Sequence, residues 1–115
     1  MEIEIKNDAG PTPRVVLTGK LDIAGAEVVA LPLATLSGGS KSGLLLDVSG
    51  VTFISSIGIR HLVSASKALA RRGGRLVLLN PSAMVTDVLE TSGVVEFMQI
   101  ARSEAEAEAA LGTGA

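Results

Sequence analysis

The chain has 115 residues, of which 47% are hydrophobic and 19% charged, so we expect residues 1–115 to form a single domain around one hydrophobic core. The formal net charge is -2, so the chain lacks the basic field that nucleic-acid binding needs. It has two Phe and no Tyr or Trp, so it also lacks a surface on which bases could stack. The sequence has no Cys, no signal-peptide pattern and no apolar run near the roughly 18 residues of a membrane span, which predicts a cytoplasmic protein without disulfides or membrane insertion.

The first half of the chain is predicted to form two strands, a helix and a third strand. Residues 2–6 alternate isoleucine with charge, and residues 14–18 hold three consecutive apolar side chains after a turn-rich stretch, which predicts a hairpin. Asp22 is placed to cap a helix that Pro32 kinks or divides, because proline removes one backbone hydrogen bond. After a loop rich in glycine and serine, residues 44–48 are apolar enough for a strand covered on both faces, at the centre of the sheet.

A second helix is predicted to begin near Ser55 or Ser56 and to end at two glycines, Gly73 and Gly74. Its apolar positions recur at helical spacing and would face the core. These positions are Ile59, Leu62, Val63, Ser66 and Leu69 or Ala70.

The remaining residues again alternate strand and helix. Residues 76–79 form a buried strand, and Pro81 follows at the first position of a helix that Gly93 closes. Residues 94–100 predict a last short strand, and Ser103 begins a capped helix that ends at Leu111. We assign the apolar stripe of the helix before Gly93 to the core; it consists of Met84, Val85, Val88 and Leu89.

The predicted order of elements is ββαβαβαβα. Alternating strands and helices indicate the α/β class, with a mainly parallel central sheet of four to five strands and helices packed against it. Right-handed crossovers bring the turns that follow the parallel strands to one edge of the sheet. The pair Ser55 and Ser56 is expected at that edge.

Two interpretations of this serine pair are open. A serine at the start of a helix is often an N-cap, which contributes roughly 1 kcal/mol. Alternatively, an exposed hydroxyl in the first turn is a phosphate acceptor, because the free N–H groups and the dipole of the helix accommodate a phosphate. A phosphate adds about -1.5 to -2 charges, which would weaken a docked interface.

Two carboxylates are expected near the same edge. Asp22 and Asp47 could both lie close to Ser56, which resembles a paired-carboxylate site. We expect Asp22 to cap its helix and Asp47 to order the turn that follows the third strand. Contact with a partner is the functional alternative for Asp22.

Groups for catalysis are few. Lys41-Ser42 after glycines resembles part of a phosphate-binding loop, but a strand follows where that motif needs a helix, so we interpret the segment as a linker. His61 is the only histidine, and on a helix its side chain lies about 140° around the axis from that of Ser56, so we place it on a solvated face. With no base for a nucleophile, the sequence predicts a protein that is not an enzyme and has no catalytic residue, cofactor or metal.

Residues 44–59, LLLDVSGVTFISSIGI, resemble the signature of the STAS domain, the family of bacterial anti-sigma factor antagonists. That signature is an apolar strand, Asp-Leu-Ser, a few residues, Phe-Met or Phe-Ile, and then Asp-Ser-Ser-Gly-Leu at the start of a helix. Residues 19–22, Gly-Lys-Leu-Asp, are similar to the family's Gly-x-Leu-Asp. The order of elements fits from about residue 3 to about residue 111.

The resemblance implies a STAS-like fold and a partner-switching function. In that family an anti-sigma factor with serine kinase activity phosphorylates the antagonist, a phosphatase reverses the modification, and the unphosphorylated antagonist binds the anti-sigma factor and releases the sigma factor. The phosphorylated serine falls on Ser56, while Ser55 and Ile57 stand where the pattern has Asp and Ser, and Gly58 matches. The implied partner-binding residues are Asp22, Ser55, Ser56, Ile57 and Gly58.

The departures at Ser55 and Ile57 leave an alternative open. The chain would then be a STAS accessory subunit of a transport or stress-sensing complex, which binds a partner without a phosphorylation cycle.

Overall fold

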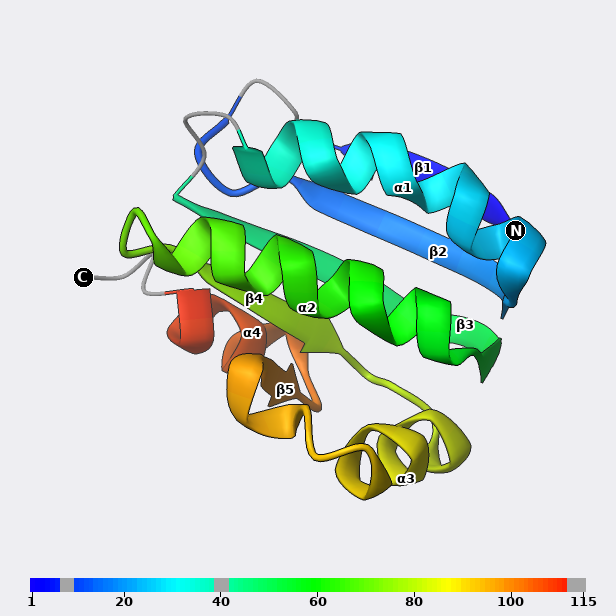
Figure 1. The fold of residues 1–115 in the computed structure, drawn as a ribbon. Helices are drawn as coiled ribbons and strands as arrows, with labels where there is room; N and C mark the ends of the chain where they lie inside the picture. Colours follow the sequence, from blue (N-terminus) through cyan, green and yellow to red (C-terminus); the bar gives the residue numbers. More distant parts are fainter. Residues whose placement is uncertain (7–9, 39–41, 112–115) are drawn as a thin grey trace.

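The computed structural model describes residues 1–6, 10–38 and 42–111 of the chain (Figure 1). The predicted order of strands and helices is confirmed, with one added 3-10 turn before the last strand. The elements are β1 (Glu2–Lys6), β2 (Arg14–Leu21), α1 (Ile23–Gly38), β3 (Gly43–Ile54), α2 (Ser56–Ala70), β4 (Arg75–Leu79), α3 (Ala83–Thr91), the 3-10 turn (Val95–Phe97), β5 (Gln99–Ala101) and α4 (Glu104–Leu111).

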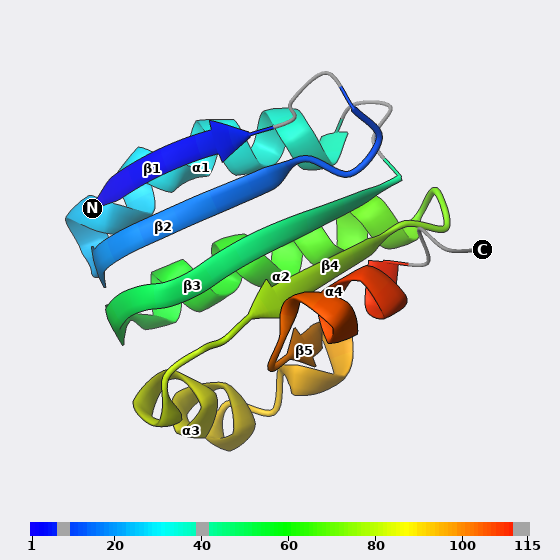
Figure 2. The same cartoon turned by 180° about the vertical axis from the view of Figure 1, so that it is seen from behind.

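The five strands form one sheet in the order β1-β2-β3-β4-β5. β1 pairs with β2 antiparallel, and every other neighbouring pair is parallel, as the alternation of strand and helix predicted. α1 and α2 lie side by side on one face of the sheet, and α4 covers the opposite face (Figures 1 and 2). Among the residues described, none of the helices has both the length and the apolar character needed to cross a bilayer.

Two apolar clusters fill the two sides of the sheet. The larger joins strand residues such as Leu17 and Leu46 to Leu33 of α1, Leu62 of α2 and Leu89 of α3. The smaller lies under α4 and consists of Leu45, Val77, Leu79, Ala101 and Ala107. Alternate residues of β3 and β4 therefore enter different cores, which is why these strands read as unbroken apolar runs.

Several predicted boundaries are wrong. β3 continues for 12 residues to Ile54, well beyond the predicted end at Val48. The last strand was predicted at residues 94–100, but β5 begins at Gln99 and ends at Ala101, because Val95–Phe97 forms the 3-10 turn. Pro81 is not the first residue of α3; it precedes the N-cap Ser82, whose Oγ accepts from the Val85 N–H at 3.2 Å.

α1 is one undivided helix with Pro32 inside it, so proline does not split it. The carbonyl that loses its N–H donor belongs to Val28, a residue on the exposed side of the helix. The core assignment of Met84 is also wrong, because its side chain is 40% exposed. α3 lies at the border of the sheet, where only one side of the helix, with Val85 and Leu89, meets the core.

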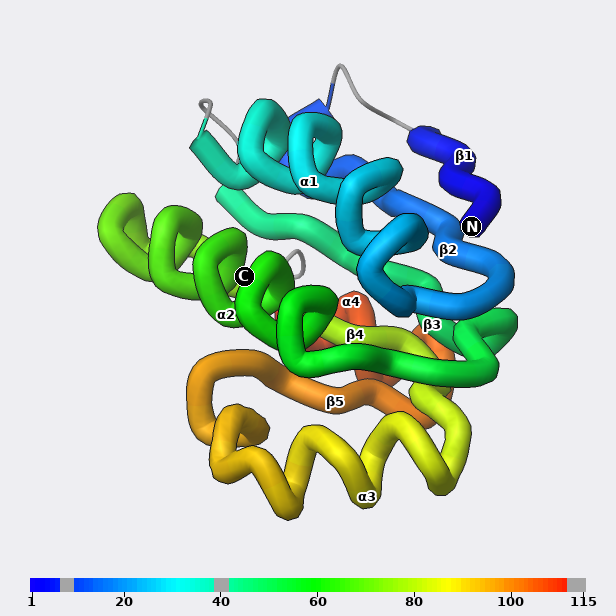
Figure 3. The backbone as a smooth tube through the Cα atoms, turned by 45° about the vertical axis from the view of Figure 1, so that its right-hand side comes forward, coloured from blue at the N-terminus to red at the C-terminus, as the bar shows by residue number. Residues whose placement is uncertain are grey.

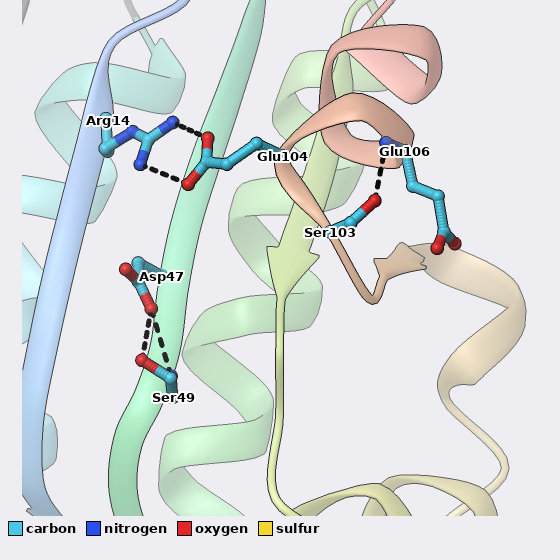
Figure 4. A network of polar contacts seen from close by, with 6 residues as sticks. All are labelled: Arg14, Asp47, Ser49, Ser103, Glu104 and Glu106. Atoms are coloured by element: carbon cyan, nitrogen blue, oxygen red, sulfur yellow. Dashed lines mark hydrogen bonds and ion pairs between the residues drawn. The ribbon is translucent and has the colours of Figure 1, made fainter.

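An ion pair connects the outer part of the sheet to α4. Both guanidinium nitrogens Nη1 and Nη2 of Arg14 on β2 donate to the carboxylate of Glu104, the first residue of α4 (Figure 4). The hydrogen bond from Arg14 holds the pKa of Glu104 below its ordinary value. The ionised carboxylate therefore favours the folded state.

Replacing this carboxylate should change the response of stability to acid. A carboxylate whose pKa is lowered by folding stabilises at neutral pH, and the gain disappears as the pH falls through the lowered pKa. Wild type should thus have a higher Tm than Glu104→Gln near pH 7, and the difference in Tm should disappear as the pH falls below the range in which a glutamate ordinarily titrates. Thermal unfolding of both proteins at a series of pH values tests this prediction. A Tm difference that does not vary with pH would show that ionisation of Glu104 contributes nothing to stability.

Candidate functional site

The turn between β2 and α1 lies beside the turn between β3 and α2 (Figure 3). Leu21 and Ile54, the last residues of the two strands, are paired in the parallel register. The backbone N–H of Ser55 donates to the carbonyl oxygen of Leu21 at 2.9 Å and ties the two turns together. The sequence motifs around Asp22 and around Ser56 thus form one site, although they are far apart along the chain.

Ser55 is the N-cap of α2. Its half-buried Oγ accepts from the Gly58 N–H at 3.2 Å and donates to the Leu21 carbonyl at 2.9 Å. Both hydrogen-bonding roles of this hydroxyl are therefore used within the protein. The contact with the Leu21 carbonyl needs a hydrogen-bond donor, and an ionised Asp at position 55 would have none.

Ser56 is the first residue of α2 and is exposed. Within the described ranges its side chain makes no hydrogen bond, in contrast to Ser55. The structure therefore separates the two hydroxyls: the capping interpretation applies to Ser55, and the hydroxyl of Ser56 is accessible to a modifying enzyme.

Asp22 caps α1, as predicted. Its Oδ1 accepts from the Gly25 N–H at 2.8 Å, and its carbonyl oxygen accepts from the Ala26 N–H at 2.7 Å. The residue is half-buried, and the turn that carries it lies beside the start of α2 (Figure 3). Contact between Asp22 and a partner stays a prediction.

Glycine at position 58 lets α2 begin close to Leu21. A Cβ on Gly58 would lie 2.8 Å from Leu21 Cγ and 3.1 Å from the Leu21 carbonyl oxygen. Gly58 is buried and Ile57 is half-buried, so of residues 56–58 it is Ser56 that is exposed in the free protein. Gly58 thus has a packing role within the chain, and the partner contacts expected of Ile57 and Gly58 stay predictions.

Asp47 does not join the site, so the expected cluster of Asp22, Asp47 and Ser56 is wrong. Asp47 lies inside β3, and its Oδ1 accepts from the N–H and the hydroxyl of Ser49 at 3.1 and 2.7 Å (Figure 4). The register of β2 against β3 shifts here, so the carboxylate orders a bulge where a turn was predicted. At about 3.3 Å per residue, Asp47 is roughly 23 Å from the end of β3.

His61 is half-buried and lines a groove between α1 and α2, so its assignment to a fully solvated face is only partly right. No group of three or more His, Asp or Glu side chains in the described part of the chain is arranged to hold a metal ion. Lys41 lies outside the described residues, and Ser42 leads directly into β3.

The sequence analysis missed the apolar residues around the site. Ile23, which follows Asp22, is 69% exposed, and Phe53 on β3 is 44% exposed. The signal was present in both cases: Ile23 follows a helix cap, and Phe53 alternates with the buried Ile54 along the strand. Large apolar side chains exposed at the end of a sheet are typical of a protein-binding surface.

The different roles of the two serines can be measured directly. Ser55→Ala removes the cap and leaves one acceptor bond to Leu21 unmade, so the free energy of unfolding should fall by about 1 to 2 kcal/mol. Ser56→Ala should change it by less than about 0.5 kcal/mol. Urea unfolding of the two variants tests both predictions. Equal losses in the free energy of unfolding would contradict the assignment of the cap to Ser55.

Comparison with known proteins finds relatives along most of the chain. The family model of the STAS domain matches residues 2–107. A protein of Bordetella bronchiseptica provisionally named anti-sigma factor antagonist BtrV is 32% identical over 97 residues, covering 84% of this chain and 84% of that protein. The anti-sigma F factor antagonist of Lysinibacillus sphaericus is 26% identical over 105 residues, covering 90% of each.

Solved structures show the same fold. The unphosphorylated form of the anti-sigma factor antagonist SpoIIAA superimposes with a TM-score of 0.80 at 24% identity, covering 96% of this chain and 97% of that one. The phosphorylated form of SpoIIAA, a Bacillus cell fate determinant, has a TM-score of 0.71 at 25% identity, covering 92% and 96%.

Proposed function

The chain belongs to the STAS domain family, and from this membership we propose that it is an anti-sigma factor antagonist. In this proposal it is a cytoplasmic binding protein, not an enzyme. It binds an anti-sigma factor that has serine kinase activity and thereby releases a sigma factor. Phosphorylation of Ser56 ends the binding, and a phosphatase restores it.

The observation that carries the proposal is the position of the Ser56 hydroxyl. It is exposed at the first residue of α2, while the adjacent Ser55 supplies the cap. A kinase can therefore modify Ser56 without breaking a hydrogen bond that holds the fold. The first turn of a 15-residue helix also accommodates the new charge, because its N–H groups and dipole favour an anion.

The surroundings of Ser56 explain how a phosphate would end binding. The adjacent turn carries the carboxylate of Asp22 and the exposed side chain of Ile23, so a partner seated over both turns would meet a negative charge and apolar surface beside Ser56. A partner seated on these side chains would exclude water from the phosphate. Burying about two negative charges without a matching cation costs more than the contact gains.

The accessory-subunit alternative is favoured by one observation, the replacement of the pattern's Asp and Ser by Ser55 and Ile57. Ser55 keeps the capping role of a carboxylate but not its charge. If a kinase needs that charge, Ser56 would not be modified and the site would serve only for binding.

A phosphorylation assay separates the two functions. The chain is used to capture its anti-sigma factor from the source cells, and the purified factor is incubated with ATP and wild type, Ser55→Ala or Ser56→Ala. We expect label on Ser56, retained in Ser55→Ala and lost in Ser56→Ala. A partner that binds tightly but labels no variant would favour the accessory subunit, and label on Ser55 would contradict the assignment of the hydroxyl.

A further inference from the structure

α1 has apolar side chains on all sides, although one side faces solvent. Its 16 residues include a single charged one, Glu27. Val29 and Leu33 are buried against the sheet, as expected of a covering helix, but Leu31 is 74% exposed and Val28 is 43% exposed. A helix that is apolar all round is normally covered on all sides, so the outer side of α1 has the composition of an interface.

A groove runs beside this side of α1. It lies between α1 and α2, which are adjacent on the front of the sheet (Figure 1), and has a volume of about 240 Å³. Small side chains line it, chiefly Ala30 and Ala34 from α1 and Ser64 and Ala68 from α2. Small residues allow the backbone and the larger side chains of a third helix to come close.

The border of the groove that α2 forms is basic. Arg60 and Arg71 are exposed on α2 and the residue after it, and their spacing places them on nearly the same line along the helix. Neither guanidinium has an ion pair with another described residue. The sequence contains no Asp or Glu between Asp47 and Asp87, so no acidic residue in this long segment offsets their charge.

We propose that this surface, the α1–α2 face of Leu31, the groove residues and the two arginines Arg60 and Arg71, binds an acidic amphipathic helix of a partner protein. Apolar residues of that helix would fill the groove and cover Leu31. Glutamate or aspartate residues along its flank would pair with Arg60 and Arg71. The arginines on the α2 border select acidic residues on the flank that meets α2, while the exposed Glu27 on α1, nearly in line with Ala34, disfavours acidic residues on the other flank. The concave groove suits a helix better than a flat surface.

The α1–α2 face is distinct from the switch at Ser56. Leu31 lies about 12 Å along α1 from Ile23, at 1.5 Å per residue, and so away from the turns that form the candidate site. Binding there does not rest on the proposed antagonist function, and phosphorylation of Ser56 should leave it unchanged.

The test uses synthetic peptides and backbone amide NMR of the full chain. One peptide is an 18-residue amphipathic helix with leucine and alanine on one side and glutamate on the other; the second carries lysine in place of each glutamate. The acidic peptide should shift amides of α1 and α2 around the groove. The basic peptide should bind at least tenfold more weakly.

Variants assign the contacts. Leu31→Glu and the double change Arg60→Glu/Arg71→Glu alter exposed side chains, so Tm should be retained while the affinity for the acidic peptide falls at least tenfold. The double variant should now prefer the basic peptide. Lys6→Glu, which reverses a charge on the edge strand β1, should change neither affinity.

Several results would overturn the proposal. The first is that the acidic peptide shifts no backbone amides on the α1–α2 face. The second is that the acidic and basic peptides bind equally well. The third is that the double variant does not come to prefer the basic peptide. Sedimentation that shows a dimer abolished by Leu31→Glu would assign the face to a second copy. Flotation with phosphatidylserine vesicles, lost in the same variant, would assign it to an anionic membrane.

Discussion

Ser56→Asp is expected to lower the affinity for the anti-sigma factor by roughly 100-fold, which corresponds to about 2.8 kcal/mol. The substitution places a fixed negative charge at the start of α2, beside the turn that carries Asp22 and the exposed Ile23 (Figure 3). Like charges and an unpaired charge in a docked interface each cost several kcal/mol. Isothermal titration calorimetry of the purified pair gives the affinity.

The fold should not change in this variant. An acidic residue in the first turn of a helix is favourable, so Tm should remain equal to that of wild type or rise slightly. Ser64→Asp is the matched control, because Ser64 is an exposed serine two turns further along α2. Equal losses of affinity in the two variants would show that the effect is general repulsion and not a property of position 56.

Gly25→Ala is expected to cause the largest loss of stability among single-methyl substitutions at the site. A Cβ at this position would lie 2.2 Å from the carbonyl oxygen of Lys20 and 3.3 Å from Met1 Cβ. The first contact is with backbone, so the start of α1 must move, and such overpacking costs about 3 kcal/mol. For a domain of this size the Tm should fall by roughly 15 °C.

Gly38→Ala is the control for this prediction. Gly38 is the last residue of α1, and a Cβ there meets no atom within 4 Å. Alanine at that position should leave the free energy of unfolding unchanged or raise it by up to about 1 kcal/mol, because alanine favours helix. Thermal and urea unfolding measure both variants, and similar values for the two would contradict the close approach at Gly25.

Local signals predicted the order of elements and the starts of α1, α2 and α4 well. Asp22, Ser55 and Ser103 each accept from an N–H three residues further on, and this geometry depends only on nearby residues. The resemblance in residues 44–59 then indicated the fold. Capping and hydrophobic periodicity are encoded in short windows, and such windows are visible in one sequence.

Pairing between distant strands explains the errors. The Asp47-Val48-Ser49 run has turn-forming residues, but its pairing with β2 keeps it in an extended strand with a bulge. The periodicity of α3 placed Met84 in the core, but that helix lies at the border of the sheet. Neither outcome follows from the local sequence, because each depends on the neighbour that a segment meets in space.

The same limit applies to the site. Helix-start signals alone left Ser55 and Ser56 as equivalent candidates for the cap, and only the family resemblance assigned the phosphate acceptor to Ser56. What separates them is the hydrogen bond from Ser55 to the carbonyl of Leu21, across 34 positions of the chain. Once this contact is known, one hydroxyl is occupied and the other is accessible.

The central claim, that phosphorylation of Ser56 controls binding, is tested most directly by one titration. The anti-sigma factor is titrated calorimetrically with the unmodified chain and with the chain phosphorylated at Ser56 to full occupancy, as verified by intact mass and site mapping. We predict tight binding of the unmodified form and an affinity at least 100-fold lower for the phosphorylated form. Equal affinities for the two forms would contradict the account.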